Sequence, residues 1–362
     1  MPPATGQPGL NDRALTGLRG LAALMVVAHH YVLLGLPHEP LWPGLERGLY
    51  IAVDLFFVLS GYVMCLAYAG WFPRGLSLAV LPAYAGFVLR RLARLWPLHV
   101  AVTVAVILAT YLGTGGLPWP KLVATNLLLV QGWGIGQSIN APAWSISTEF
   151  AAYLLFPILL LPAVHGPAPW AWLMAGLACG LLLAAVHLSP ELPGARRGAL
   201  DIHMNWSVLP LLRCLGGFIV GLLLFRALRH PAVRGAASHP LAAPAALAAF
   251  IGGIGVQVPD LLLYPVLPVL VAATHHAAGA YGRQAGRSVA YGLGVVSYPL
   301  YLVHYPILSV LPAGWPARGF EFVFAVLLCI AAAYAAHRLV ERPGQRAVLR
   351  LGPSLPRLAP AR

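Results

Sequence analysis

Long apolar stretches recur along the chain, each separated from the next by a short segment that contains Pro, Gly or Arg. A helix that crosses a membrane needs about 20 mostly apolar residues. Ten stretches approach that length, at 14–36, 49–70, 98–114, 147–165, 170–188, 208–226, 240–256, 259–276, 289–311 and 319–340. The pattern predicts an all-α, polytopic bundle of about ten transmembrane spans, although the two stretches around Pro259 could also form one kinked segment.

Residues 78–97 also have a helical pattern, but they are too basic to cross a bilayer. We expect them to form an in-plane helix at the membrane surface. The predicted domains are an N-terminal tail (1–11), a membrane domain (12–343) and a basic, Pro- and Arg-rich tail (344–362) that we expect to be disordered. We expect neither a secretory signal nor an appended soluble domain.

Composition supports the membrane interpretation. Of the 362 residues, 59% are hydrophobic and 9% are charged, whereas about 25% of a typical soluble domain is charged. These values exclude a soluble globule, and a disordered chain would be poor in apolar residues. The four cysteines lie in separate apolar stretches without metal-ligand spacing, so we expect no disulfide scaffold, no metal site and no bound cofactor.

The net charge of +13 could indicate a nucleic-acid partner, but most basic residues flank apolar stretches instead of forming a soluble basic patch. If the N-terminus is cytoplasmic, seventeen of the 23 Lys and Arg residues fall on the cytoplasmic side. This bias predicts that both termini are cytoplasmic. It also predicts contact with anionic membrane lipids, and no binding of nucleic acid.

Ionisable side chains within a bilayer are costly and therefore mark functional sites. Arg19 and His30 are eleven residues apart, which corresponds to about 1,100° of helical rotation and about 16 Å of rise, so they share one helix face. Asp54, at a similar depth on the next helix, could orient His30 and fix its tautomer. A structural hydrogen bond between the helices is the alternative. His29 points to another side of its helix and is a weaker candidate.

Two further polar groups are predicted in the outer half of the bilayer. Glu149 follows Ser145 and Ser147 at the start of a helix, where the serines could cap the helix and the carboxylate would suit its positive end. His304 lies between two prolines of a later span. Because His30, Asp54, Glu149 and His304 have similar predicted depths, we expect them to converge on one site.

The inner side carries a basic cluster. Arg91 and Arg94 lie on adjacent turns of one helix face, and Arg19 begins the first span at a similar depth. Positive-inside topology alone could account for these arginines. Arginine also suits bidentate binding of phosphate, so the cluster indicates an anion site on the cytoplasmic face.

Seven motifs occur in a characteristic order. They are Arg19 with His30 after ten intervening residues, AVDLFFVLSGY, RLARLWP, WSISTE, RCLGGFIVG, SYPLYLVHYP and LVERP. Together they resemble acyltransferase family 3, which includes membrane O-acyltransferases of the O-antigen acetylase type, over about residues 11–345. Ala52 stands where Gly is common in the family, and Ile146 where Leu is common.

The resemblance implies an enzyme that transfers an acyl group, usually acetyl, from acetyl-CoA to a hydroxyl of a cell-surface carbohydrate, a lipid-linked sugar or a small molecule. It implies a multi-pass location in a bacterial cytoplasmic membrane. His30 would be catalytic, as general base or transient acyl carrier, together with Asp54 and Glu149. Six residues would bind donor or acceptor: Arg19, Arg91, Arg94, Ser145, Ser147 and His304. A proton-coupled transporter or exporter, in which the buried groups relay protons, is the alternative.

Overall fold

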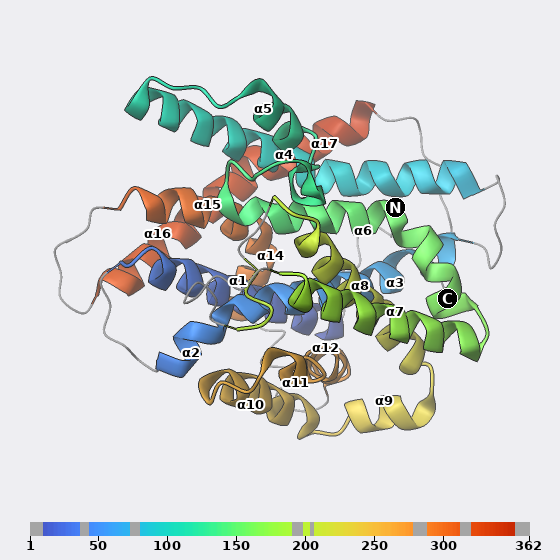
Figure 1. The fold of residues 1–362 in the computed structure, drawn as a ribbon. Coiled ribbons are helices and arrows are strands. Elements are labelled where there is room, and N and C mark those ends of the chain that lie inside the picture. The colour runs from blue at the N-terminus through green and yellow to red at the C-terminus, as the bar shows by residue number, and fades with distance from the viewer. Residues whose placement is uncertain are drawn as a thin grey trace.

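The computed structural model describes residues 10–36, 43–72, 80–189, 198–202, 206–277, 288–311 and 320–351. Every regular element in these ranges is a helix, which confirms the all-α prediction (Figure 1). The α-helices are α1 (Leu10–Leu33), α2 (Pro43–Gly48), α3 (Ala52–Tyr68), α4 (Leu81–Thr114), α5 (Pro120–Leu127), α6 (Trp144–Leu160), α7 (Ala168–His187), α8 (Leu209–Ala227), α9 (Pro231–Ala237), α10 (Ala242–Gly255), α11 (Asp260–Leu263), α12 (Val266–His275), α14 (Ser288–Val295), α15 (Ser297–Ser309), α16 (Glu321–Ala336) and α17 (Arg342–Leu351).

All ten predicted apolar stretches coincide with helices, but fewer are uninterrupted spans. Within the described ranges, six helices are long and apolar enough to cross a membrane, or seven if α9 and α10, which meet at 70°, form one broken span. The 24-residue α1 is not among them, since Arg19, His29 and His30 lie along it. The helices support an integral membrane protein, whereas the number of about ten spans and the orientation of the termini stay predictions.

The predicted in-plane helix at 78–97 is wrong. Residues Leu81–Thr114 form one continuous helix, α4, which passes through Pro97 and includes the predicted span 98–114. Its arginines do not require a separate surface helix, because Arg91 and Arg94 face a cavity inside the protein. The basic residues of α4 therefore belong to the same helix as its apolar second half, and Arg91 and Arg94 have partners inside the protein.

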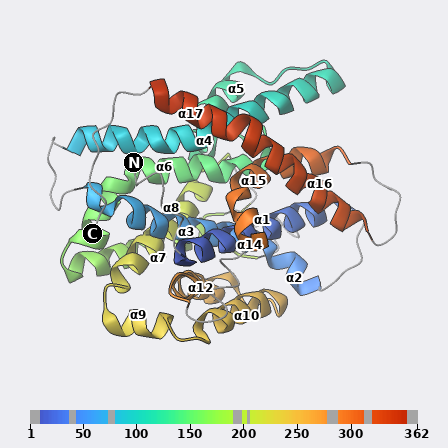
Figure 2. The same cartoon turned by 180° about the vertical axis from the view of Figure 1, so that it is seen from behind.

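The predicted disorder of the C-terminal tail is also wrong in part, because the chain stays helical as far as Leu351. A π-helical segment, His337–Glu341, joins α16 to α17. Seen from behind, α17 crosses the outer side of α4 (Figure 2). The end of the chain thereby packs on the helix that carries the basic cluster.

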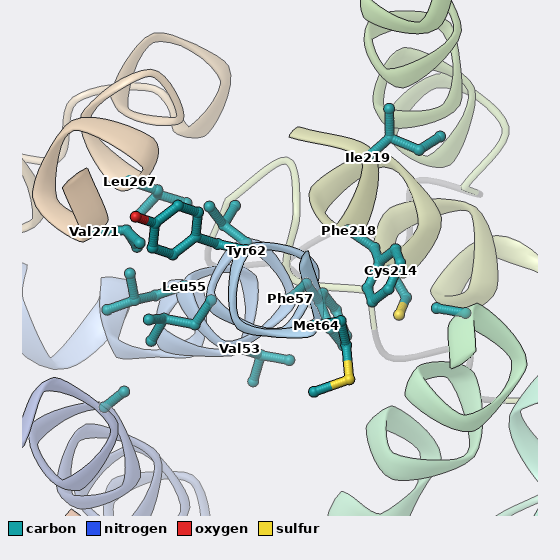
Figure 3. Packing of buried hydrophobic residues seen from close by; sticks show 14 of the residues in the cluster. Val53, Leu55, Phe57, Tyr62, Met64, Cys214, Phe218, Ile219, Leu267 and Val271 are labelled. Carbon is teal, nitrogen blue, oxygen red and sulfur yellow. The ribbon is translucent and has the colours of Figure 1, made fainter. Parts of the chain in front are cut away.

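Helix α3 forms the centre of the bundle. Its hydropathy is high and 83% of the most apolar window of its span is buried inside the protein. Figure 3 shows that opposite sides of α3 contact different helices: Tyr62 faces Leu267 of α12, while Phe57 faces Phe218 of α8. A helix that is apolar all round is expected at the middle of such a bundle.

Small residues set the register between α3 and α8. A Cβ atom on Gly61 would lie 2.0 Å from the Phe218 carbonyl oxygen, and one on Gly221 would lie 2.3 Å from the Val58 carbonyl oxygen. The backbones therefore approach more closely than any larger residue would allow. This register brings Asp54 of α3 alongside Arg213 of α8, two turns away along both helices.

Candidate active site

Three internal cavities lie in a row through the bundle. The first, which we call the arginine cavity, has a volume of about 90 Å³. The last, the histidine cavity, has a volume of about 130 Å³. A connecting cavity of about 50 Å³ shares Arg19, Phe56, Glu149 and Tyr298 with the first and Val53 and Tyr301 with the last. The shared residues place it between the other two.

Arg19 and His30 line successive parts of this row. Arg19 lines both the arginine cavity and the connecting cavity, whereas His30 lines the histidine cavity. Both side chains therefore face the interior from one helix, as the spacing predicted. His29, predicted to point elsewhere, is also buried against the histidine cavity, so that expectation is wrong.

The arginine cavity joins Arg19 of α1 to Arg91 and Arg94 of α4, as predicted. Arg91 donates a 2.6 Å hydrogen bond to the Tyr68 hydroxyl and stacks over its ring. Arg94 forms an ion pair with Glu341 and lies 5.4 Å over the ring of Tyr298. Three guanidinium groups thus line a small space, two of them held by partners, which suits binding of an anion with several oxygens.

Glu341 was quoted in the LVERP motif but given no role by the sequence. Its side chain is 1% exposed and contacts both Arg94 and, at 2.6 Å, Nδ1 of His337. It lies in the π-helical segment, a rare conformation that is frequent at functional sites. His337 is a local partner four residues earlier, whereas Arg94 is distant in the sequence, so only the tertiary structure reveals that ion pair.

Glu149 does not line the same cavity as His30, and the two serines of α6 have different surroundings. Glu149 lines the arginine cavity, where it accepts a 2.5 Å hydrogen bond from Tyr153, and not the histidine cavity. Ser145, one helical turn earlier, lines the connecting cavity and lies 2.6 Å from the Tyr301 hydroxyl. The prediction that Glu149 shares one site with His30 is therefore wrong.

Ser147 lines none of the three cavities and instead forms hydrogen bonds that hold the fold together. It donates to the Leu129 carbonyl and accepts from the Gly132 amide, so it ties α6 to the irregular turn at 131–135. Two residues correspond to about 200° of helical rotation, which turns Ser147 away from the face of Ser145. The helix is not capped by either serine, because its N-cap is Ala143 without a side-chain hydrogen bond.

His30, which lines the histidine cavity, is paired with the buried His304. Nε2 of His304 lies 3.1 Å from Nδ1 of His30, and the two residues are 274 positions apart. Gly20 of α1 and Gly294 of α14 pack against each other ten residues before the two histidines, with a Cβ on Gly20 only 2.7 Å from the Gly294 nitrogen. This close contact fixes the register that places the two imidazoles together.

The hydrogen bonds define the tautomers of this pair. Nδ1 of His304 lies 3.0 Å from the Leu300 carbonyl, which only accepts, so this nitrogen carries a proton. Its Nε2 is then the acceptor of the proton on Nδ1 of His30, which also lies 3.0 Å from the Val26 carbonyl. The lone pair of His30 is consequently on Nε2, the nitrogen that can take a proton from a substrate.

Asp54 has a different partner from the one predicted. Its carboxylate accepts two hydrogen bonds from Arg213, from Nε at 2.9 Å and from Nη2 at 2.6 Å, and both side chains are at most 2% exposed. The prediction that Asp54 orients His30 is therefore wrong, since His304 occupies that position. A buried carboxylate is stabilised far better by a guanidinium than by a neutral imidazole.

Arg213 is the residue that the sequence analysis missed. It lines the histidine cavity and lies 5.7 Å over the ring of Trp144. The sequence analysis gave it no role, although it lies inside the apolar run of α8. A charge in such a run requires a buried partner, which Asp54 provides.

A short segment closes the histidine cavity on another side. Asp201, in the described segment 198–202, is buried and lines the cavity. Asp260 holds this segment by accepting from the Leu200 amide at 2.6 Å and from the Tyr50 hydroxyl at 2.7 Å. The cavity thus combines imidazoles, a fixed ion pair, a carboxylate and several aromatic rings, a set suited to binding a polar molecule with hydroxyl groups.

No group of three or more His, Cys, Asp or Glu side chains able to hold a metal ion occurs within the described ranges.

Comparison with known proteins agrees with this chemistry. The sequence profile of an acyltransferase domain, that of acyltransferase family 3, matches residues 12–338. A relative from Streptomyces mycarofaciens, acyltransferase MdmB, is 30% identical over 325 residues, which cover 82% of this chain and 78% of the relative. No solved structure shows a significant match.

A second relative is named putative peptidoglycan O-acetyltransferase YrhL, from Bacillus subtilis (strain 168). It is 23% identical over 91% of this chain, which spans 54% of that longer protein. The chain belongs to acyltransferase family 3. It is a membrane acyltransferase that transfers groups other than aminoacyl groups, so the transporter interpretation is not needed to explain its buried polar groups.

Proposed function

We propose that the protein transfers an acyl group, in the first instance acetyl, from acyl-CoA at the cytoplasmic face to a hydroxyl of a carbohydrate or similar acceptor. The observation that carries the proposal is the row of cavities, with a guanidinium cluster at one end and a histidine pair at the other. The name of the Bacillus subtilis relative, a putative peptidoglycan O-acetyltransferase, supports the acetyl group and a glycan acceptor.

In this proposal Arg19, Arg91 and Arg94 bind phosphate oxygens of the donor. The thin pantetheine arm then extends through the connecting cavity past Ser145 and Tyr301 toward His30. Arg19 and His30 are separated by about 16 Å along α1, a distance that an extended arm must cover. The excess of Lys and Arg on one side supports a cytoplasmic arginine cavity.

The acceptor enters the histidine cavity, where its hydroxyl donates to Nε2 of His30. His30 removes the hydroxyl proton as the oxygen attacks the thioester carbonyl carbon. The C–S bond then breaks, the new C–O ester bond remains on the acceptor, and the thiolate of coenzyme A takes up a proton. His304 is a positioning residue that keeps the lone pair of His30 on the reacting nitrogen.

The test distinguishes the role of the histidine cavity in transfer from the role of the arginine cavity in donor binding. Purified His30→Ala protein is expected to lose at least about 100-fold in transfer rate, the usual scale for a general base, while its affinity for desulfo-coenzyme A stays unchanged. Arg91→Gln is expected to weaken that affinity by about ten-fold, a typical value for one charged hydrogen bond.

Transfer is followed as release of the coenzyme A thiol and as the mass of the acylated acceptor. To find the acceptor, cell-surface glycans of cells with and without the protein are compared by mass. Undiminished transfer by His30→Ala would remove the proposed mechanism, and unchanged coenzyme affinity in Arg91→Gln would remove the donor site.

A further inference from the structure

A fourth and much larger cavity lies outside the row, between α7 and α8. This groove, which we call the α7–α8 groove, is open to the surface and has a volume of about 800 Å³. Its polar lining comes from Arg226, Arg229, His165 and His230, while Leu223, Trp172 and several alanines supply an apolar floor. None of the described residues that line it is acidic, so the groove has a net positive charge.

Local structure explains why the arginines stand here. Helix α6 ends in a π-helical segment, Leu161–His165, whose last carbonyl groups have no helical partner. Arg226 donates from Nη1 to the Gly166 carbonyl at 2.6 Å, and Arg229 donates from Nη1 to the Val164 carbonyl at 3.3 Å. The hydrogen bonds of both guanidinium groups to described residues all come from Nη1, so each retains Nη2 and Nε for a ligand.

The groove lies where two candidate membrane spans reach the membrane surface. It is lined by the first turns of α7 and the last turn of α8, both of which meet the criteria for a span. Only 22% of the most apolar window of α7 is buried, and Trp170 and Trp172 in its first turn are 52% and 78% exposed. Exposed tryptophans at the end of an apolar helix are typical of the interface between lipid headgroups and acyl chains.

The chemistry of the groove favours a ligand with an acidic head and an apolar body. A soluble anion would use the guanidinium groups but would gain nothing from the apolar floor, which is continuous with the exposed apolar face of α7. Basic pockets between transmembrane helices are known to bind the headgroups of anionic lipids. We propose that the α7–α8 groove binds an anionic phospholipid, with its phosphate on Arg226 and Arg229 and its acyl chains along α7.

This site is separate from the donor site but lies toward the same end of the bundle. Phe225, next to Arg226, packs 6.3 Å from the ring of Tyr62, and the adjacent Val63 lines the arginine cavity. The two cavities have no lining residue in common. A bound lipid would therefore stabilise the α6–α8 end of the bundle without occupying the arginine cavity.

The test uses the purified full-length protein in detergent, with lipid retention measured by native mass spectrometry. Phosphatidylglycerol is the probe and phosphatidylcholine, which has no net charge, is its control. The variant Arg229→Gln removes an exposed charge of the groove, and Arg234→Gln removes an exposed charge of α9 that does not line it. Arg226 is spared at first because its bond to Gly166 also holds the end of α6.

Wild type and Arg234→Gln are expected to retain phosphatidylglycerol in preference to phosphatidylcholine. Arg229→Gln is expected to lose about five-fold in phosphatidylglycerol affinity, the usual effect of one basic residue near an anionic headgroup. A double variant, Arg229→Gln with His230→Gln, keeps the test valid if the first effect is small, because both side chains are exposed and their replacement should leave the fold intact.

Three outcomes would overturn the proposal. The first is equal retention of the two lipids by the wild type. The second is an equal loss of phosphatidylglycerol affinity in Arg229→Gln and Arg234→Gln. The third is a fall in desulfo-coenzyme A affinity in Arg229→Gln with unchanged lipid retention, which would assign the groove to phosphates of the acyl donor.

Discussion

The arginine cavity and the histidine cavity hold their polar groups in opposite ways. In the arginine cavity, the guanidinium groups of Arg91 and Arg94 are oriented by aromatic rings, a tyrosine hydroxyl and the carboxylate of Glu341. At the histidine cavity, Asp54 and Arg213 neutralise each other, and the imidazoles of His30 and His304 are set by backbone carbonyls. One end keeps positive charge available for an anion, while the other keeps a neutral base available for a proton.

The difference shows that depth along the bundle does not by itself decide what a buried polar residue does. Asp54, which is buried, and Glu149, which is half-buried, both lie near the N-terminal ends of their helices, yet Glu149 faces the arginines and Asp54 forms a closed pair. Which helix face a residue occupies, and which helix packs there, determines its partner. Substitutions at the residues that hold one cavity in place should therefore affect different properties of the protein from substitutions at the other cavity.

The largest effect is expected from Asp54→Asn, which leaves Arg213 as a buried charge without its carboxylate. Removing one partner of a buried ion pair costs about 3–5 kcal/mol, so the free energy of unfolding should fall by that amount. Thermal unfolding in detergent measures the loss. Replacing both residues, Asp54→Leu with Arg213→Met, should recover much of the stability, and a double variant as unstable as Asp54→Asn would contradict the proposed pairing.

Next in size is His304→Ala, which removes the acceptor that holds the proton on Nδ1 of His30. Mixed tautomers of His30 should then reduce kcat by about 100-fold, within the usual range for general-base catalysis, with little change in donor KM. His304→Gln, whose side-chain carbonyl can accept from Nδ1, should recover part of the rate. Equal rates for the two variants would show that His304 has only a packing role.

A smaller effect is expected at the other cavity from Glu341→Gln. Arg94 would lose the carboxylate that orients its guanidinium, so the KM for the acyl donor should rise by about ten-fold while kcat changes little. Initial rates at varied donor concentration measure this split. A lower KM would mean that Glu341 merely reduces the positive charge of the cavity, and the orienting role would be wrong.

The smallest effects come from a matched pair of serines on α6. Ser145→Ala should lower the transfer rate several-fold, because Ser145 lies in the connecting cavity beside Tyr301. Ser147→Ala should leave the rate unchanged and cost about 1 kcal/mol of stability, the usual value of a buried hydrogen bond. A rate loss confined to Ser147→Ala would contradict the position of the connecting cavity.

Features that depend on one helix could be predicted from the sequence. The apolar stretches locate the helices, and helical spacing correctly places Arg19 with His30 and Arg91 with Arg94 on interior faces. The same spacing distinguishes Ser145 from Ser147, although the sequence analysis did not use it. These predictions succeed because the rotation per residue of a helix is fixed by its backbone.

Features that depend on two distant helices could not be predicted. Asp54 lies 159 residues from Arg213, and His30 lies 274 residues from His304. The sequence predicts the depth of each acid along the bundle but not its partner, so several partners at the same depth were possible. The choice was made by close glycine contacts, such as Gly61 with Phe218, which a pattern of apolar and polar positions does not reveal.

The ion pair between Arg94 and Glu341 has a consequence for how the protein is made. Arg94 belongs to an early helix, whereas Glu341 lies near the end of the described chain. During synthesis, the ribosome delivers Arg94 to the membrane long before its carboxylate exists. The arginine cavity can therefore be completed only after the last described helices have been inserted, so a nascent or prematurely terminated chain would lack a finished cavity.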